Sequence, residues 1–192
     1  DIRFERLEIG DLNWDPTQTK FEHGAGAVWG LTCVGVKVIN CNLFGTTQGT
    51  GLWRPALGFE LYGNLIHDHG IESTTGKPGG RGEGHASYTQ NIEGTKRLEH
   101  NISYRNYGWG IDLYTQQGEV SGFDIIENIG YIASWLKPGQ VGFNFGLTGW
   151  KPAERIRFIG NVGYQSRGPE QAWRSNMRLM YHKDPGIVHN DA

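Results

Sequence analysis

The chain has 192 residues, 30 of them glycine, with a formal net charge of −2 and a sequence pI of about 6.4. This near balance of charge disfavours nucleic acid and anionic membranes as partners, because both require a basic surface. No apolar run approaches the roughly 18 residues of a membrane span, so we expect one domain and no membrane span.

An asparagine recurs along the chain within a repeated apolar frame. Its positions, separated by 22, 37, 27 and 33 residues, are Asn42, Asn64, Asn101, Asn128 and Asn161. The residue three places before each Asn is apolar, and so is the residue one place after it, as Ile39 and Leu43 illustrate in the first repeat. A period that survives insertions is typical of a solenoid.

Each repeat carries strand chemistry and lacks the three- and four-residue apolar spacing of helical repeats. Short alternating runs such as 123–126 and 156–159 are followed by Gly or Asn. Asn and Gly tolerate the left-handed backbone of a tight corner, and Asn also hydrogen-bonds along a stack of identical neighbours. The sequence therefore predicts an all-β fold, a parallel β-helix of about six coils.

Neither end of the sequence contains an obvious segment that could cap a terminal coil. Residues 2–7 already resemble part of a coil, and residues 181–192 are polar. A solenoid needs its terminal coils covered, and neither end shows an amphipathic helix that could serve. We expect one β-helix domain over 1–192, a fragment or mature piece lacking one or both end caps.

The insertion after residue 66 contains candidate metal ligands. His67 and His69 lie at i and i+2, so on a strand they point the same way. With Glu72, Glu83 or His85 they are candidates for a transition-metal site.

A glycine-rich loop follows at 75–83. Such a loop commonly overhangs the binding face of a solenoid, and its Lys77 and Arg81 are candidates to bind an anionic substrate. The alternative is a surface loop with no partner.

A further strand in most coils is placed by anchoring on glycine. Gly84, Gly110 and Gly142 begin the segments 85–88, 111–114 and 143–146, and Asn176 begins 177–180. Alternation predicts these inward side chains: Ile111, Leu113, Phe143, Phe145, Met177 and Leu179. The predicted outward column is Ala86, Asp112, Asn144 and Arg178, flanked by Tyr88 and Tyr114.

The run Gly-His-Ala-Ser-Tyr-Thr-Gln-Asn at 84–91, with Gly-Thr-Lys-Arg at 94–97 and His-Asn-Ile at 100–102, carries a family resemblance. It resembles the right-handed parallel β-helix proteins of the pectate-lyase-like superfamily, in particular bacterial members with a Gly-His-Gly-Ile-Tyr-type strand before a Gly-Thr-Lys turn. The similarity extends from about Val34 to Leu179. It implies a secreted or cell-surface protein that handles polysaccharide, since most members of known activity cleave or bind acidic glycans along the solenoid's flank.

The catalytic motifs of the polygalacturonase-like hydrolases in that superfamily are present only as fragments. Gly84-His85-Ala86 and Arg155-Ile156-Arg157 correspond in part to Gly-His-Gly and Arg-Ile-Lys, and the sequence contains no Asp-Asp pair. Hydrolysis by paired carboxylates needs an acid and a base flanking one bond. A hydrolase is therefore less favoured than a lyase.

A lyase needs a group that neutralises the uronate carboxylate and a base that removes the adjacent proton. The catalytic candidates are His85, Asp112, Tyr114 and Arg178. Arg178, or a calcium held by Asp112 and Asn144, serves the first role, and His85, Tyr88 or Tyr114 serves the second. The candidate substrate-binding residues are Tyr88, Asn144, Lys77, Arg81 and Trp53.

Each candidate also has a structural alternative. His85 is then a buried corner residue, Tyr88 and Tyr114 are a stacked pair, and Asp112 with Arg178 is a surface charge interaction. A ladder of His67, Tyr104, Tyr131 and Tyr164, three places after the Asn, either packs or grips sugar faces.

The expected function is that of an extracellular polysaccharide-active protein, lyase-like on acidic glycans, with an anionic polysaccharide as partner and calcium as a candidate cofactor. The alternative is a non-catalytic glycan-binding or adhesin module, or a structural solenoid module of a larger surface protein. Fold analogy alone does not establish a reaction.

Overall fold

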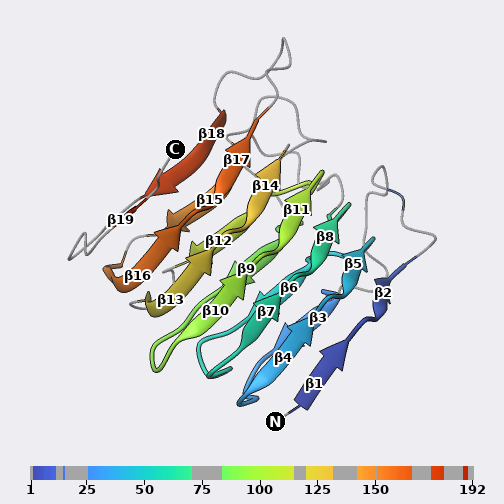
Figure 1. Ribbon diagram of the computed structural model, residues 1–192, viewed down its shortest axis with the longest axis horizontal. Coiled ribbons are helices and arrows are strands. Elements are labelled where there is room, and N and C mark those ends of the chain that lie inside the picture. The colour runs from blue at the N-terminus through green and yellow to red at the C-terminus, as the bar shows by residue number, and fades with distance from the viewer. Residues whose placement is uncertain are drawn as a thin grey trace.

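The computed structural model describes residues 2–11, 15, 26–70, 84–114, 120–131, 142–149, 151–165, 174–179 and 188–189. Its strands wind into a right-handed parallel β-helix, so the predicted fold class is confirmed. Figure 1 shows the strands of successive coils lying side by side, from the N-terminal coil to the C-terminal one. Within the described segments, no helix is long and apolar enough to cross a membrane.

The described strands form three parallel sheets, here called A, B and C. Sheet A contains β1 (Ile2–Glu5), β4 (Val36–Ile39), β7 (Glu60–Tyr62), β10 (Lys96–Glu99), β13 (Val120–Ile126), β16 (Ala153–Ile159) and β19 (Val188–His189). Sheet B contains β2 (Glu8–Gly10), β5 (Asn42–Phe44), β8 (Leu65–His67), β11 (Ile102–Tyr104), β14 (Ile129–Tyr131) and β17 (Val162–Tyr164). Sheet C contains β3 (Val28–Gly30), β6 (Thr50–Leu52), β9 (Ser87–Thr89), β12 (Ile111–Tyr114), β15 (Gly142–Thr148) and β18 (Arg174–Leu179).

The corner between sheets A and B combines a left-handed residue with a buried asparagine. The residue just before each ladder position has a positive φ, as at Gly63 (67°), His100 (56°) and Glu127 (50°). Asn40 and Gly63 take the left-handed conformation at their corners, whereas the ladder asparagines are not among the described residues of positive φ. Their contribution is a hydrogen bond, and the residue before each of them makes the bend.

The asparagine ladder joins consecutive coils through side-chain amides. Asn101 Oδ1 accepts hydrogen bonds from the backbone N and Nδ2 of Asn64, at 3.0 and 2.9 Å. Its Nδ2 donates to the carbonyl oxygen of Leu61 at 3.0 Å and to Asn128 Oδ1 at 2.9 Å. The same bonds recur from Asn128 to Asn161. The predicted hydrogen-bonded stack is confirmed for these four asparagines.

Asn42 does not belong to this ladder. Cys41 stands at its place, because the Cys41 backbone N donates to Asn64 Oδ1 at 2.9 Å and Asn42 pairs with Leu65. The core residue aligned with Leu61 is accordingly Val38 and not Ile39. The prediction for the first repeat was one residue out of register. Val38 and Ile39 are both apolar, and only their burial in the structure shows that Val38 is the one that faces the core.

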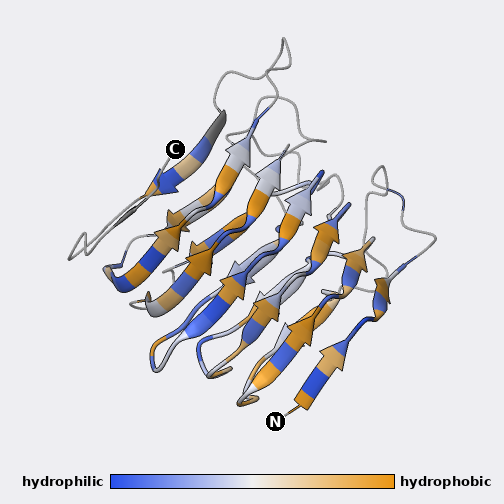
Figure 2. Ribbon diagram, viewed as in Figure 1, coloured by the Kyte–Doolittle hydropathy of each residue, from blue (hydrophilic) through white to orange (hydrophobic). Residues whose placement is uncertain are grey.

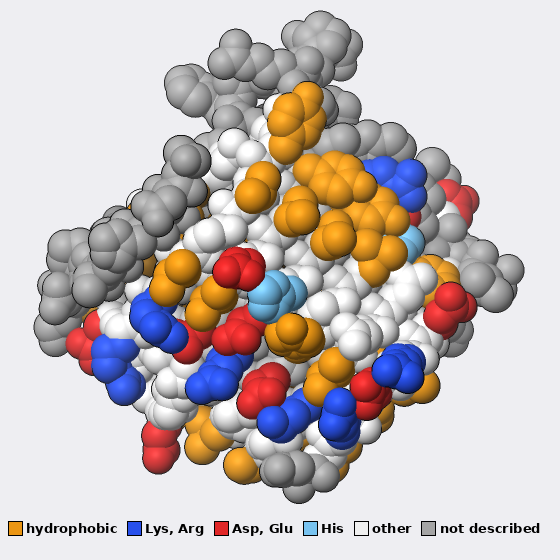
Figure 3. Space-filling view, in the orientation of Figure 1, with side chains coloured by type: hydrophobic (Ala, Val, Ile, Leu, Met, Phe, Trp, Pro, Cys, Tyr) orange, Lys and Arg blue, Asp and Glu red, His pale blue; other side chains and the backbone are white. Residues whose placement is uncertain are grey.

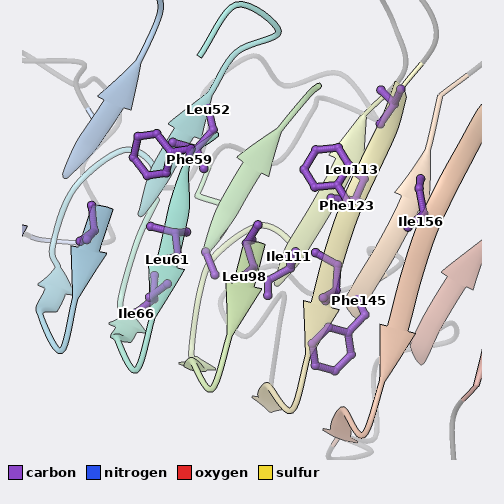
Figure 4. Packing of buried hydrophobic residues seen from close by; sticks show 14 of the residues in the cluster. Leu52, Phe59, Leu61, Ile66, Leu98, Ile111, Leu113, Phe123, Phe145 and Ile156 are labelled. Carbon is purple, nitrogen blue, oxygen red and sulfur yellow. The ribbon is translucent and has the colours of Figure 1, made fainter. Parts of the chain in front are cut away.

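The inward residues of the three sheets form one core. Figure 4 shows buried side chains from successive strands pointing into the space between the sheets, among them Leu52, Phe59, Leu61, Leu98 and Ile111. Side chains one position after the ladder Asn point outward instead: Ile102, Ile129 and Val162 are 37%, 42% and 59% exposed. That apolar column therefore covers the outside of sheet B and is not part of the core.

The outer faces of sheets A and B differ in chemistry. On sheet A, charges alternate between neighbouring strands: Lys37 Nζ lies 3.1 Å from Glu60 Oε1, and Arg157 binds Asp124 through two bonds of 2.7 Å. On sheet B, apolar and aromatic side chains gather, as Figure 3 shows over β8, β11 and β14 and Figure 2 shows in the colouring of the strands. The outer face of sheet C carries the candidate site.

Candidate functional site

One outward column on sheet C gathers most of the predicted site. The parallel register aligns Gly51 with Tyr88, Tyr88 with Asp112, Asp112 with Gly146, and Gly146 with Arg178. Adjacent strands in a sheet are about 4.8 Å apart, so Asp112 lies about one strand spacing from Tyr88 and about two from Arg178. Folding therefore brings together residues that are 90 positions apart in sequence, from Tyr88 to Arg178.

Asp112 is fully buried on this face. Thr148, one strand further along the solenoid, donates its hydroxyl to Asp112 Oδ1 at 2.8 Å. The other oxygen, Oδ2, lies 3.7 Å from His85 Nε2, which exceeds the length of a hydrogen bond. Among the residues that the structure describes, Oδ2 has no hydrogen-bond partner. A buried carboxyl oxygen without a partner is costly, so it marks Asp112 as a candidate for a functional role.

His85 lies against aromatic rings on the same face. Its ring centroid is 5.2 Å from that of Tyr88 and 4.9 Å from that of Trp109, both in edge-on contacts. Trp109 in turn stacks on Phe143 at 4.6 Å. Neither ring nitrogen of His85 has a hydrogen-bond partner within the described part of the chain. His85 is therefore buried, as the structural alternative predicted, but its ring makes no hydrogen bond to the backbone in this region.

Burial moves the two pKa values in opposite directions. It raises the pKa of Asp112 to about 7, against the hydrogen bond from Thr148 and the positive charge of Arg178. It lowers the pKa of His85 to about 3. At neutral pH the imidazole is thus uncharged, and its burial makes it a weak base, while much of Asp112 carries a proton that it can donate.

An aromatic row extends along the same face. Trp29 stacks on Trp53 at 5.7 Å, Trp53 meets Tyr88 edge-on at 5.6 Å, and Tyr88 lies 5.2 Å from Tyr114. Trp29 also lies over Gly51, where an added Cβ would come within 2.0 Å of its ring. The predicted candidates Trp53, Tyr88 and Tyr114 are neighbours in this row.

Asn144 does not join the outward column. Its Nδ2 donates to the carbonyl oxygen of Tyr164 at 3.0 Å and to Asn176 Oδ1 at 3.1 Å. Its side chain lies close to Gly130 of sheet B, where a Cβ would be 2.8 Å from that of Asn144. The predicted calcium pair of Asp112 and Asn144 is not brought together, because the column position belongs to Gly146.

Asn144 was placed in the outward column because the sequence analysis aligned Gly84, Gly110 and Gly142 with one another. The register pairs Ile111 with Ser87 and with Phe145, so Gly84 and Gly142 each stand two residues earlier than Gly110 in their coils. Tyr88 therefore replaces Ala86 in the column. Phe143, predicted to be inside, is buried on the outer face, with its ring within 2.0 Å of a Cβ built on Gly146.

His67 and His69 point to different places. His67 stacks between Phe44 and Tyr104 on the outside of sheet B, at 5.8 and 4.7 Å. Asp68 has a φ of 55°, which ends the strand and turns the next side chain away. His69 is buried, with Nε2 3.0 Å from the carbonyl oxygen of Leu43 and a pKa lowered by burial to about 3. The premise that both histidines share one face of a strand is therefore wrong.

No group of three or more His, Cys, Asp or Glu side chains is arranged for a metal ion among the residues that the structure describes. The further ligand candidates Glu72 and Glu83 lie outside the described residues, and so do Lys77 and Arg81.

On sheet B, Tyr104 and Tyr131 stack at 5.0 Å with an interplanar angle of 4°. Their faces contact each other, which favours packing over the gripping of sugar rings.

Sequence reasoning missed residues that complete the site. Trp109 contacts the ring of His85 and Thr148 bonds Asp112, and both lie at or just outside strand ends, where alternation gives no indication. The sequence analysis assigned Lys96 only to a turn, although it lies two residues before Leu98 and therefore faces the same inner side of the strand. Its Nζ bonds the carbonyl oxygens of Trp53 and Gln90, both at 2.6 Å.

The chain matches no protein-family model, and neither curated proteins nor solved structures show significant similarity to it.

Proposed function

We propose that this protein is a polysaccharide-active β-helix protein of the secreted or cell-surface kind, related to the pectate-lyase-like superfamily. The outer face of sheet C is its site, and the reaction is a lyase-like elimination on an acidic glycan. The observation that carries the proposal is the buried pair of His85 and Asp112, with side-chain atoms 3.7 Å apart and, in the described part of the chain, no hydrogen-bond partner for either ring nitrogen or for Asp112 Oδ2.

The elimination needs three groups, and this face offers one for each. Arg178 pairs with the uronate carboxylate and stabilises the charge that develops there. His85 takes the proton on the carbon next to the carboxylate once substrate entry relieves the burial that lowers its pKa, and that electron pair forms the new carbon–carbon double bond. The glycosidic bond then breaks, and Asp112 gives its proton to the departing oxygen. No water is consumed, and one chain end becomes unsaturated.

The burial of the pair limits how substrate reaches it. Asp112 is 0% and His85 is 5% exposed, whereas Tyr88 and Tyr114 are partly exposed beside them. A glycan therefore meets the tyrosines first, and contact with the pair requires the rings around it to move. Catalytic hydrogen bonds are often long without substrate and shorten in the complex.

The test is turnover on polygalacturonate, alginate and glycosaminoglycans, followed by the ultraviolet absorbance of unsaturated ends. We expect His85→Ala and Asp112→Asn to abolish the signal while circular dichroism stays unchanged. His100→Ala is the matched control, because His100 is an exposed histidine at the corner between sheets A and B, outside sheet C. Absence of turnover by the wild-type protein on the whole panel would exclude the lyase.

The activity should also depend on pH in a defined sense. Asp112 must be protonated to act as the acid, so the rate should fall as pH rises through about 7. His85 stays neutral down to about pH 3, so no acidic limb is expected between pH 4 and 7 from this group. A rate that rises steadily from pH 6 to 9 would contradict these roles.

One observation favours a second candidate, a non-catalytic glycan-binding module. The aromatic row of Trp29, Trp53, Tyr88 and Tyr114 offers a binding track that does not depend on the buried pair, and Trp29 is 40% exposed. For this function His85→Ala and Asp112→Asn would retain wild-type affinity for the glycan, with no turnover in any variant.

A further inference from the structure

A second set of ladder hydrogen bonds lies at the corner between sheets B and C. Asn106 Oδ1 accepts the backbone N–H of His69 at 3.3 Å, and Asn106 Nδ2 donates to the carbonyl oxygen of Ile66 at 3.2 Å. Asn64 makes the same two kinds of bond at the corner between sheets A and B, both 2.9 Å long. At both corners, the two bonded backbone groups of the preceding coil are three residues apart.

The ring of His69 makes the same two bonds, one coil earlier than Asn106. Its Nδ1 lies 3.3 Å from the backbone N of Thr46, and its Nε2 lies 3.0 Å from the carbonyl oxygen of Leu43. Because a backbone N–H can only donate and a carbonyl oxygen can only accept, Nδ1 is the acceptor and Nε2 carries the hydrogen. The corner therefore holds His69 as one neutral tautomer.

A second proton on this ring would break the corner. His69 is 0% exposed, and a hydrogen on Nδ1 would face the Thr46 N–H, which would then lose its acceptor. The Thr46 hydroxyl, whose oxygen lies 3.0 Å from Nδ1, can accept that hydrogen, but the backbone N–H stays without a partner. A buried charge and an unpaired buried donor both destabilise the closed corner.

Few charged groups face His69, and burial outweighs them. Burial lowers the pKa of His69 to about 3, and the positive charge of His67 acts in the same direction. The hydrogen bonds to residues 43 and 46 and the carboxylate of Asp68 oppose this shift. Asp68 is itself bonded to Arg105 of the next coil, and residues 43–46 of the preceding coil contain no charged side chain.

The same corner holds the segment that lies against His85. The carbonyl oxygen of His69 accepts the N–H of Tyr107 at 2.7 Å. Trp109 follows two residues later, and its ring centroid lies 4.9 Å from that of His85. An opening of the corner therefore loosens the backbone that positions Trp109.

We propose that His69 is an acid-sensitive latch, which keeps the corner between sheets B and C closed while its ring is neutral and opens it on protonation. Opening releases residues 107–109 and loosens the cover of His85. The latch depends only on the hydrogen bonds of the corner, so it does not require that the protein be a lyase.

The direction of the pH dependence follows from the two states. The pKa of the ring is about 3 in the closed corner, whereas a histidine exposed to solvent has a pKa of about 6.5. Between these two values the open state binds one more proton than the closed state. The equilibrium constant for opening therefore rises by about tenfold for each unit by which the pH falls.

Amide hydrogen exchange in the 192-residue chain, followed by NMR, measures this opening residue by residue. The reporters are the amides of Thr46 and Tyr107, which bond to the ring and to the carbonyl oxygen of His69. The reference is the amide of Ile129, which bonds to a carbonyl oxygen at the corner between sheets A and B, at 2.8 Å.

Two variants separate the latch from other titrating groups. His69→Asn supplies the carboxamide that Asn106 uses one coil later, and it has no group that titrates in this range. His100→Asn is the matched control, because His100 is an exposed histidine at the corner between sheets A and B. His85 is present in both variants, so its titration cancels in the comparison.

We expect Thr46 and Tyr107 to open more readily than Ile129, with opening constants that rise about tenfold per pH unit between about pH 6 and about pH 4. In His69→Asn the change at Thr46 over that range should be less than about twofold, and His100→Asn should behave like wild type. Equal opening constants for Thr46 and Ile129 would overturn the latch. So would an unchanged pH dependence in His69→Asn.

A second measurement decides the case even if His69→Asn does not fold. The nitrogen chemical shifts of the His69 ring in the wild-type protein should show the hydrogen on Nε2 at about pH 6 and no second proton in the folded state down to about pH 4. A ring that takes up a proton near pH 6.5 while Thr46 and Tyr107 stay protected would overturn the latch. Neither measurement involves turnover, so failure of the latch can be told apart from failure of the lyase.

Discussion

Lys96 and Asp112 are both buried polar residues, and their surroundings give them different roles. Burial lowers the pKa of Lys96 to about 7, yet its three carbonyl acceptors suit the protonated form, so the side chain closes a corner of the coil. Asp112 has one hydrogen bond from Thr148 and one oxygen without a partner in the described chain. A satisfied buried charge is explained by structure, whereas an unsatisfied carboxyl beside a neutral imidazole points to chemistry.

The pH dependence of stability tests the environment of Asp112. Its pKa is raised from 3.8 to about 7 in the folded protein, so the native state binds more protons between these values and stability falls as pH rises across them. Each pH unit in that window costs about 1.4 kcal/mol. Asp112→Asn keeps the shape of the protonated acid without this loss.

We therefore expect Asp112→Asn and wild type to melt alike near pH 4, and the variant to melt higher at pH 8 by at least about 2–4 °C, the shift for about 1 kcal/mol in a chain of this size. Both proteins contain His85, so its own titration cancels in the comparison. A variant that melts lower than wild type at pH 8 would mean that the ionised carboxylate stabilises the fold.

At the scale of the element, the corner between sheets A and B is the most regular unit of the fold. A left-handed residue bends the chain at the corner, and the asparagine after it satisfies two backbone groups of the preceding coil, as Asn101 does for Asn64 and Leu61. Left-handed φ costs more for residues such as His100 and Glu127 than for Gly63. The hydrogen bonds of the ladder hold these residues in that conformation.

Asn101→Ala should destabilise the protein by about 3 kcal/mol or more, because it leaves the buried backbone N–H of Asn64 and the carbonyl of Leu61 without these partners. Asn42→Ala is the matched control. Asn42 lies outside the ladder, and its Oδ1 lies 2.9 Å from Nε2 of His67. Its loss should cost less than about 1 kcal/mol. Urea unfolding of both variants measures the difference, and equal midpoints would contradict a stabilising ladder.

At the scale of the whole molecule, the contribution of a core side chain to stability depends on whether a coil packs against it on both sides or on one. Phe4, Val38 and Leu61 occupy the same inward column on neighbouring strands of sheet A. Leu61 is 0% exposed, whereas Phe4, in the first coil, is 38% exposed. A side chain at the end of a solenoid has a neighbour on one side only, so it buries less apolar surface.

In the 192-residue chain, Leu61→Ala should cost about 2–5 kcal/mol, the range for a large cavity in a packed core. Phe4→Ala should cost less, although it deletes more carbon atoms. Denaturant midpoints of the two variants decide the order. A larger loss at Phe4 would show that the first coil is covered in solution.

Several features could be predicted from the sequence because they depend only on side-chain type and spacing. Inward and outward positions alternate in a strand, so recurring apolar residues predict stacked coils, and recurring Asn predicts a hydrogen-bonded ladder. The same alternation placed Tyr88, Tyr114, Asp112 and Arg178 on one outer face. The sequence by itself therefore determined the solenoid and the face that carries the candidate site.

The register within sheet C was decided only by the tertiary structure. A glycine has no side chain to mark the inside or outside of a strand, so Gly84 and Gly142 gave no indication that they stand two residues earlier than Gly110. The surroundings of His85 and Asp112 could not be predicted from the sequence either, because Trp109 and Thr148 contact them from neighbouring coils. Their altered pKa values follow from burial, which depends on contacts across coils and not on any local pattern.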